Sequence, residues 1–160
     1  MASFQELSLR DRLLLAAYPW RRIDPPAWAE PLRPVSAARV AIVTSAGFSR
    51  PGIDPPVRAI IGGDVSLRIL PADTSLDRLE LGQISHSFDR EALATDPSSA
   101  LPIPHLDALV AAGRIGSVAP RHLSFNGSIL APGRLVAETG PEAARILAED
   151  QVDLALFVPV

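Results

Sequence analysis

Residues 39–47 read RVAIVTSAG, and this short stretch decides the fold class. Four apolar residues follow one another from Val40 to Val43, and the polar pair Thr44 and Ser45 comes next. A strand that is buried on both faces has this continuous apolar pattern, which is typical of parallel sheets covered by helices. Ligands of open parallel sheets bind beyond the carboxyl ends of the strands. The stretch therefore predicts a central strand, with Thr44 and Ser45 as candidate ligand-binding residues.

The end of the chain supplies a second strand of the same kind. Residues 151–160, QVDLALFVPV, predict a buried strand, and residues 139–151, TGPEAARILAEDQ, predict the helix before it. A helix, a short loop and an apolar strand form half of a βαβ crossover. In this helix Thr139 and Glu142 have the spacing of a capping box. An alternative is one helix from about residue 132, kinked at the Gly140-Pro141 pair.

The segments between these two strands predict the remaining elements. They are a strand over residues 66–70, a long connection with short helical turns over 71–104, a helix from Pro104 that ends at Gly113, and a short strand within 115–120. We therefore predict a three-layer α/β domain over residues 39–160, with a mostly parallel sheet of Rossmann-like or flavodoxin-like type. Because the sequence ends on an apolar strand, we expect the domain to be incomplete, with its C-terminal continuation missing from these 160 residues.

Residues 1–38 are expected to be a separate N-terminal part. Residues 8–17 predict a short amphipathic helix. Residues 19–34 contain five prolines, which exclude a regular helix or a central strand. We interpret this part as a helix and an extended arm through which a homo-oligomer could form.

The composition excludes several classes of chemistry. The chain has 160 residues and a net charge of −3, so neither a nucleic-acid partner nor a membrane partner is indicated, and we expect a cytoplasmic protein. There is no Cys, which excludes disulfides and thiol nucleophiles within these residues. All fifteen basic residues are Arg, which excludes a Schiff-base lysine and the lysine of a P-loop.

Two histidine-containing segments are further candidates. His86 lies in ISHSFD, and His122 lies in PRHLSFNG between Arg121 and the polar residues Ser124 and Asn126. We interpret both segments as polar and irregular. The histidines could transfer protons, could bind a metal with a carboxylate, or could be packing residues. We predict no metal or cofactor.

The run IPHLDALVAAGRIGSVAPRHLSFNGSI (103–129), together with ISHSFD (84–89) and the Asp-Pro pair at 96–97, resembles the selenoprotein B family. This family provides the selenocysteine-bearing component of glycine, sarcosine, betaine and D-proline reductases, and it has shorter stand-alone relatives. The resemblance extends from about residue 39 to residue 160. It implies a reductase with a small-molecule substrate and a thioredoxin-like electron donor.

In that family the redox residue, selenocysteine or Cys, follows the apolar strand directly. The resemblance therefore places it just after Val160. Because selenocysteine is encoded by a codon that otherwise means stop, our hypothesis is a selenoprotein truncated at this codon, inactive by itself. His86, Arg121 and His122 would support the reactive anion or deliver protons, and Thr44, Ser45, Ser124 and Asn126 would bind the substrate.

Two other functions stay open. The chain could be a non-catalytic module that binds a partner or serves as a subunit. It could also be a hydrolase or a metal enzyme that uses His86 and His122.

Overall fold

The computed structural model describes residues 8–18, 22–27, 29–83 and 90–160. The chain divides into two compact units, residues 1–30 and residues 31–160. In the first unit, helix α1 (Leu9–Ala17) confirms the predicted helix. The described residues of the arm form neither a regular helix nor a strand before residue 35, as the prolines require.

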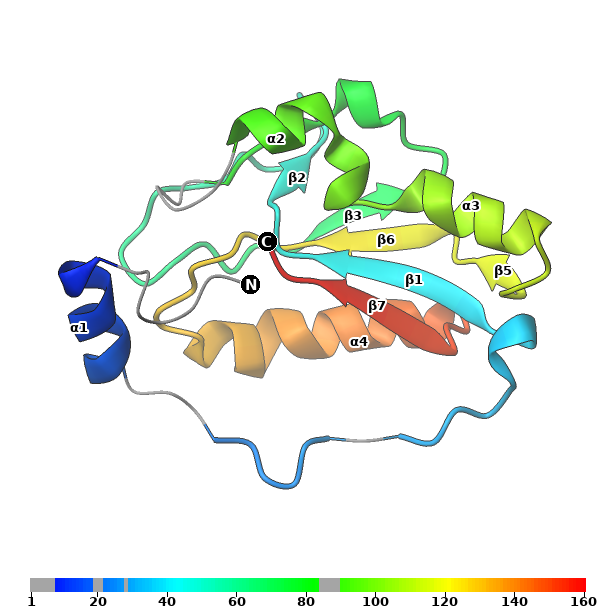
Figure 1. Cartoon of the computed structure of the whole chain (residues 1–160), viewed down its shortest axis with the longest axis horizontal. Helices are drawn as coiled ribbons and strands as arrows, with labels where there is room; N and C mark the ends of the chain where they lie inside the picture. Colours follow the sequence, from blue (N-terminus) through cyan, green and yellow to red (C-terminus); the bar gives the residue numbers. More distant parts are fainter. Residues whose placement is uncertain (1–7, 19–21, 28, 84–89) are drawn as a thin grey trace. The chain divides into compact units, whose positions relative to one another are not determined.

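The second unit is an α/β domain (Figure 1). Its strands are β1 (Arg39–Thr44), β2 (Phe48–Ser49), β3 (Arg68–Pro71), β4 (Glu80–Leu81), β5 (Ser117–Val118), β6 (Arg121–Ser124) and β7 (Leu154–Val158). Its α-helices are α2 (Arg90–Thr95), α3 (Ile103–Ala111) and α4 (Gly140–Glu149). Short helical turns are η2 (Val35–Ala37), η3 (Leu76–Arg78), η4 (Pro97–Ser99) and η5 (Leu135–Thr139).

The main sheet has five strands, and β1 lies at its centre. β7 pairs with one edge of β1, while β5 and β6 follow one another along the other edge, all parallel to β1. β3 pairs with β6 and is antiparallel to it. The predicted mostly parallel α/β sheet is thus confirmed, and β3 is the exception. A separate two-stranded sheet pairs β2 with β4.

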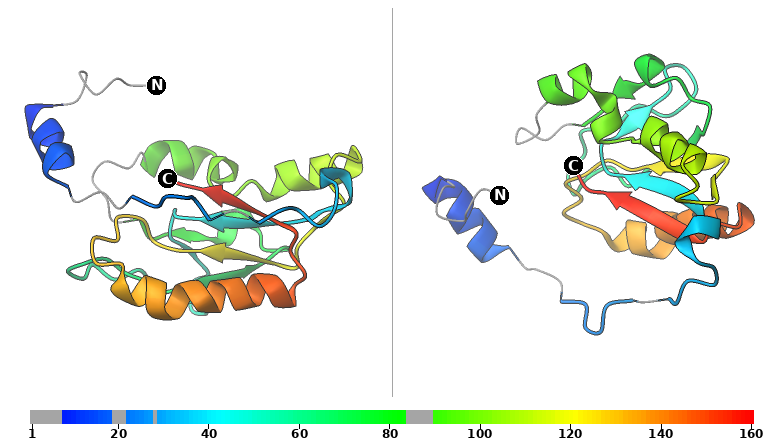
Figure 2. Two further views of the ribbon diagram at one scale, coloured as in Figure 1. Left: turned by 90° about the horizontal axis from the view of Figure 1, so that it is seen from below. Right: turned by 45° about the vertical axis from the view of Figure 1, so that its right-hand side comes forward.

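Helices cover both faces of the main sheet, as the views in Figures 1 and 2 agree. On one face Val43 and Leu123 pack with Ala143 and Ile146 of α4. On the other face lies a larger cluster, to which β1, α2 and α3 contribute Val40, Ile42, Leu93, Ile103 and Leu106. The continuous apolar run of β1 is explained by this arrangement, because alternate side chains enter different clusters.

The interpretation of residues 121–124 as irregular is wrong. They form β6, a central strand between β3 and β1, and His122, Leu123 and Ser124 are all buried. The polar side chains at alternate positions concealed the strand, since a strand that is buried on both faces usually lacks them.

The predicted capping box is also wrong, and the alternative of one helix that begins near residue 132 is confirmed. The chain is helical from residue 133 through α4 without a break. Thr139 has helical dihedral angles and its hydroxyl makes no cap hydrogen bond. The one π-helical turn of η5 lies just before Pro141, which has no N–H to continue the regular hydrogen-bond ladder.

The last strand is parallel to β1, as predicted, but it is not buried on both faces. β7 pairs with β1 alone among the described strands, and the side chain of Phe157 is 70% exposed. The prediction of burial rested on apolar composition, which does not distinguish an edge strand from a central strand.

Candidate functional site

Three neighbouring strands of the sheet end at the same level. Thr44 of β1 is in register with Ser124 of β6 and with Val158 of β7. Because the three strands are parallel, the residues that follow them lie at one edge of the sheet. The sequence prediction that Thr44 and Ser45 lie at the carboxyl end of a central strand is confirmed.

Ser45 joins the segments that leave β1 and β7. Its hydroxyl accepts a hydrogen bond from the Val160 N–H at 2.9 Å and donates one to the Val160 carbonyl at 3.4 Å. Its own N–H donates to the carbonyl of Val158 at 3.1 Å. Residues 159 and 160, which follow the last residue of the ladder, are therefore held beside the end of β1.

Gln83 and Gly127 complete this edge, and sequence reasoning missed both as site residues. The Gln83 side chain is buried and its amide nitrogen lies 3.3 Å from the Ser45 carbonyl, to which it donates. A Cβ atom at Gly127 would lie 2.9 Å from the same amide nitrogen and 3.4 Å from the Ser45 carbonyl, so only glycine fits without displacement. No sequence motif marks Gln83, whereas Gly127 stands in the S-F-N-G run.

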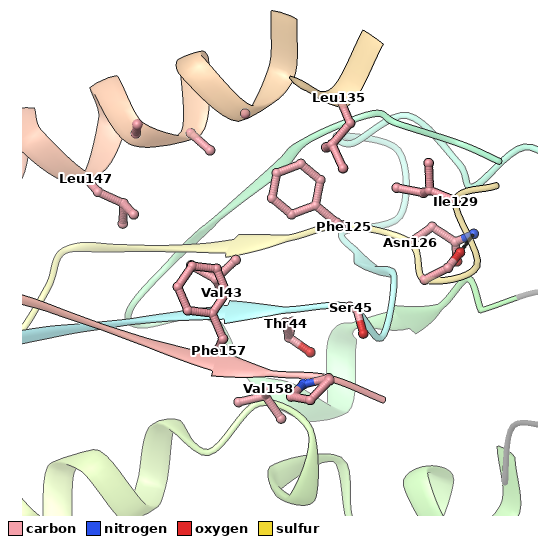
Figure 3. A pocket seen from close by; sticks show the side chains of 15 residues that line it. Val43, Thr44, Ser45, Phe125, Asn126, Ile129, Leu135, Leu147, Phe157 and Val158 are labelled. Atoms are coloured by element: carbon pink, nitrogen blue, oxygen red, sulfur yellow. Dashed lines mark hydrogen bonds between the residues drawn. The ribbon is translucent and has the colours of Figure 1, made fainter. Parts of the chain in front are cut away.

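A cavity of about 570 Å³ opens beside this edge, between α4 and the sheet. Figure 3 shows that aromatic and aliphatic side chains from both layers point toward each other across it. Its lining residues are Val43, Thr44, Ser45, Phe125, Asn126, Gly127, Ile129, Leu135, Gly140, Ala143, Ala144, Leu147, Phe157, Val158 and Pro159. This volume is in the range of small-molecule sites.

The four predicted ligand-binding residues all lie at this edge. Thr44, Ser45 and Asn126 line the cavity, and Ser124 is the sheet neighbour of Thr44. The Thr44 hydroxyl accepts from the Ala46 N–H at 3.2 Å, and the Asn126 amide donates to the Gly127 carbonyl at 3.1 Å. The Ser124 hydroxyl and the side-chain oxygen Oδ1 of Asn126 are buried without a hydrogen-bond partner among the described residues. Their binding roles stay predictions.

His122 lies outside the lining of the cavity. It is 0% exposed, and its Nδ1 accepts a hydrogen bond from the Ile42 N–H at 3.1 Å, at the point where the ladder on β1 passes from β5 to β6. The imidazole thus replaces a backbone carbonyl, and the proton of the neutral ring is on Nε2. Burial lowers the pKa of His122 to about 4, although the carboxylate of Asp107 acts in the opposite direction.

Arg121 lies at the other end of β6 from the cavity, since it is the first residue of that strand. Its guanidinium makes two hydrogen bonds to the Asp150 carboxylate, at 2.7 and 2.8 Å, and reaches Glu149 at 3.4 Å. This pair ties β6 to the end of α4. The geometry of the described residues thus brings neither Arg121 nor His122 to the cavity, and their catalytic roles stay predictions.

His86 lies outside the described residues, so its predicted role is still a prediction. Among residues 8–18, 22–27, 29–83 and 90–160, no group of three or more metal-binding side chains is assembled. Within the same ranges, no helix has the length and apolar character needed to cross a membrane.

The fold and the site together define an α/β protein with a cavity of about 570 Å³ at the carboxyl ends of a mostly parallel sheet. Over 134 residues the chain is 32% identical to the D-proline reductase subunit gamma of Acetoanaerobium sticklandii, and it is a distant homologue of that protein. The match covers 83% of this chain, and the chain spans about half, 53%, of the length of that relative. No protein-family model matches the chain. No solved structure matches it either.

Proposed function

We propose that this chain is the substrate-binding part of a selenol- or thiol-dependent reductase in the selenoprotein B family. The relation to a D-proline reductase subunit supports a component of a reductase complex. The observation that carries the proposal is the double hydrogen bond between the Ser45 hydroxyl and the backbone of Val160. It holds the segment after β7 at the edge of the sheet where α/β enzymes bind their ligands.

In the proposed reaction, a selenocysteine or Cys directly after Val160 is the nucleophile. Its anion attacks the substrate or an activated adduct of it, because the selenolate or thiolate is the reactive form. A neighbouring Cys then displaces the reduced product and closes a selenenyl sulfide or a disulfide. A dithiol protein of the thioredoxin-like class returns two electrons and two protons to this pair. The two electrons gained by the substrate are thus those lost by the pair.

The roles proposed for His86, Arg121 and His122 differ in what supports them. His122 has only Nε2 left for proton transfer, because Nδ1 is engaged by β1. Arg121 is engaged by Asp150, so a role in holding the end of α4 is better supported than contact with substrate. For His86 the support is its position in the S-H-S-F-D segment and the family resemblance.

The direct test is the gene sequence after the codon of Val160. An in-frame TGA with a selenocysteine insertion element and a coding continuation that contains Cys is the expected result, as is a Cys codon at this position. A TAA or TAG codon would overturn the proposed redox residue. If the expected codon is present, mass spectrometry of the protein from its native host should show selenium or a cysteine in the peptide that follows Val160.

A second candidate is a non-catalytic subunit of the same kind of complex. The exposed apolar side chains of β7, Leu156 at 42% and Phe157 at 70%, favour it, because a strand edge of this kind is commonly covered by another element. A cooperative thermal transition of the 160-residue chain, together with a monodisperse peak in size-exclusion chromatography, would support this candidate. Aggregation at the same concentration would count against it.

A further inference from the structure

The walls of the cavity beside Ser45 are formed mostly by apolar side chains. The sheet contributes Val43, Phe157 and Val158, and the helical layer contributes Leu135, Ala144 and Leu147. Among the described residues, the lining contains no ionisable side chain. A ligand that enters this space therefore exchanges water for hydrocarbon over most of its surface.

Three polar side chains of the lining, Thr44, Ser45 and Asn126, make hydrogen bonds within the protein. The Thr44 hydroxyl accepts from Ala46, the Ser45 hydroxyl is bonded to Val160, and the Asn126 amide donates to Gly127. The remaining polar atom, the side-chain oxygen Oδ1 of Asn126, is inaccessible to solvent and has no hydrogen-bond partner among the described residues. No formal charge in the described lining can thus compensate a charged ligand group that leaves water, and such a group is costly to bury unpaired.

The neighbouring helical segment carries two ion pairs and, in addition, Glu142. Arg134 forms an ion pair with Glu138 at 2.9 Å, and Arg145 pairs with Glu149. Both pairs are on the exposed side of the helix and neither contributes to the lining. Each pair is neutral as a whole, so neither of them gives the helical wall of the cavity a net charge.

We propose that this cavity binds a small uncharged molecule with an apolar body, whose polar end lies toward Ser45. A free amino acid, which carries two charges at neutral pH, is excluded from the class of preferred ligands. Because Ser45 also holds Val160, the polar end lies next to the segment where we proposed the redox residue. As a substrate class the inference rests on the proposed function, but the binding itself does not.

The test compares three ligands with the same ring and different charge. Cyclohexanecarboxamide is neutral, cyclohexanecarboxylate is an anion and cyclohexylmethylammonium is a cation at pH 7. We expect the amide to bind to the 160-residue chain at least about tenfold more tightly than either ion. Binding is followed by NMR through the methyl signals of Val43, Leu135 and Val158. Equal or tighter binding of an ion, or of D-proline or glycine, would overturn the proposal.

A matched pair of variants locates the binding. Ala144→Trp places a large side chain in the cavity, whereas Ala148→Trp makes the same exposed substitution one turn later on α4, outside the lining. We expect Ala144→Trp to weaken binding of the amide by about tenfold or more and Ala148→Trp to leave it within about twofold. Equal affinities of the two variants would overturn the location.

Two further outcomes also decide against a small ligand. If the methyl shifts follow protein concentration rather than ligand, the apolar wall is a contact between copies. If the amide fails to bind at about 10 mM, the cavity does not recover enough energy from apolar burial. The reading of the codon after Val160 is independent of these measurements, so failure of one proposal is distinguishable from failure of the other.

Discussion

Removal of the Ser45 hydroxyl is expected to release the segment around Val160 from the end of β1 without unfolding the sheet. In Ser45→Ala the Val160 N–H loses its acceptor at 2.9 Å, while the backbone bond from Ser45 N–H to the Val158 carbonyl is unaffected. A neutral hydrogen bond contributes about 0.5–1.5 kcal/mol. The protection of the Val160 amide against hydrogen exchange should therefore fall by roughly two- to tenfold. The free energy of unfolding should fall by about 1 kcal/mol or less.

The assay is amide hydrogen exchange by NMR, with the Ile42 amide in β1 as an internal reference. Ser45→Thr is the matched control, since it keeps the hydroxyl and suits the end of a strand. We expect this control to retain the protection of Val160. Unchanged exchange of Val160 in Ser45→Ala would refute the hydrogen bond as the restraint on this segment. A loss of protection at Ile42 as large as that at Val160 would show that the change is only global and would also refute it.

Three further predictions concern the stability of the fold. Ile146→Ala, at a side chain that is 1% exposed, should lower the free energy of unfolding by about 2–5 kcal/mol and Ile146→Val by about 0.5–1.5 kcal/mol, both measured by urea denaturation. Because the folded-state pKa of His122 is about 4, the unfolded state binds more protons between pH 4 and 6.5, so stability should fall by about 3 kcal/mol as the pH falls through this window. His122→Gln should make this part of the stability–pH curve flatter, and an unchanged slope would contradict the buried neutral imidazole. Gly116→Ala should lower the free energy of unfolding by about 1–3 kcal/mol, because its Cβ would lie 2.5 Å from the carbonyl carbon of Ala37. Gly133→Ala, with open space around it, should be neutral or slightly stabilising, and urea denaturation measures both variants.

The candidate site was only partly predictable. Thr44 and Ser45 could be found because polar residues at the end of a continuous apolar run mark the carboxyl end of a buried strand. Gln83 could not, since its contact with Ser45 joins positions 38 residues apart and no local pattern marks it. The cavity wall from α4 likewise depends on how the helix packs, so the sequence shows the apolar stripe but not the space left beside it.

Local patterns in the sequence determined several elements of this protein. β1, the helix from Pro104 to the Gly113 cap, and the stripe of Ala143 and Ile146 on α4 all follow from periodicity and from the dihedral preferences of Pro and Gly. These signals are strong because each depends on residues within a few positions of one another.

Only the tertiary structure decided which strands are central and which residues share an edge. Residues 121–124 are a central strand because β3 and β1 flank them, and their polar side chains are accepted because His122 replaces a missing backbone acceptor for Ile42. β7 has the more apolar sequence, yet it pairs with β1 alone among the described strands. Pairing and burial depend on partners far away in the chain, and an apolar run specifies that a strand is to be covered without specifying by what.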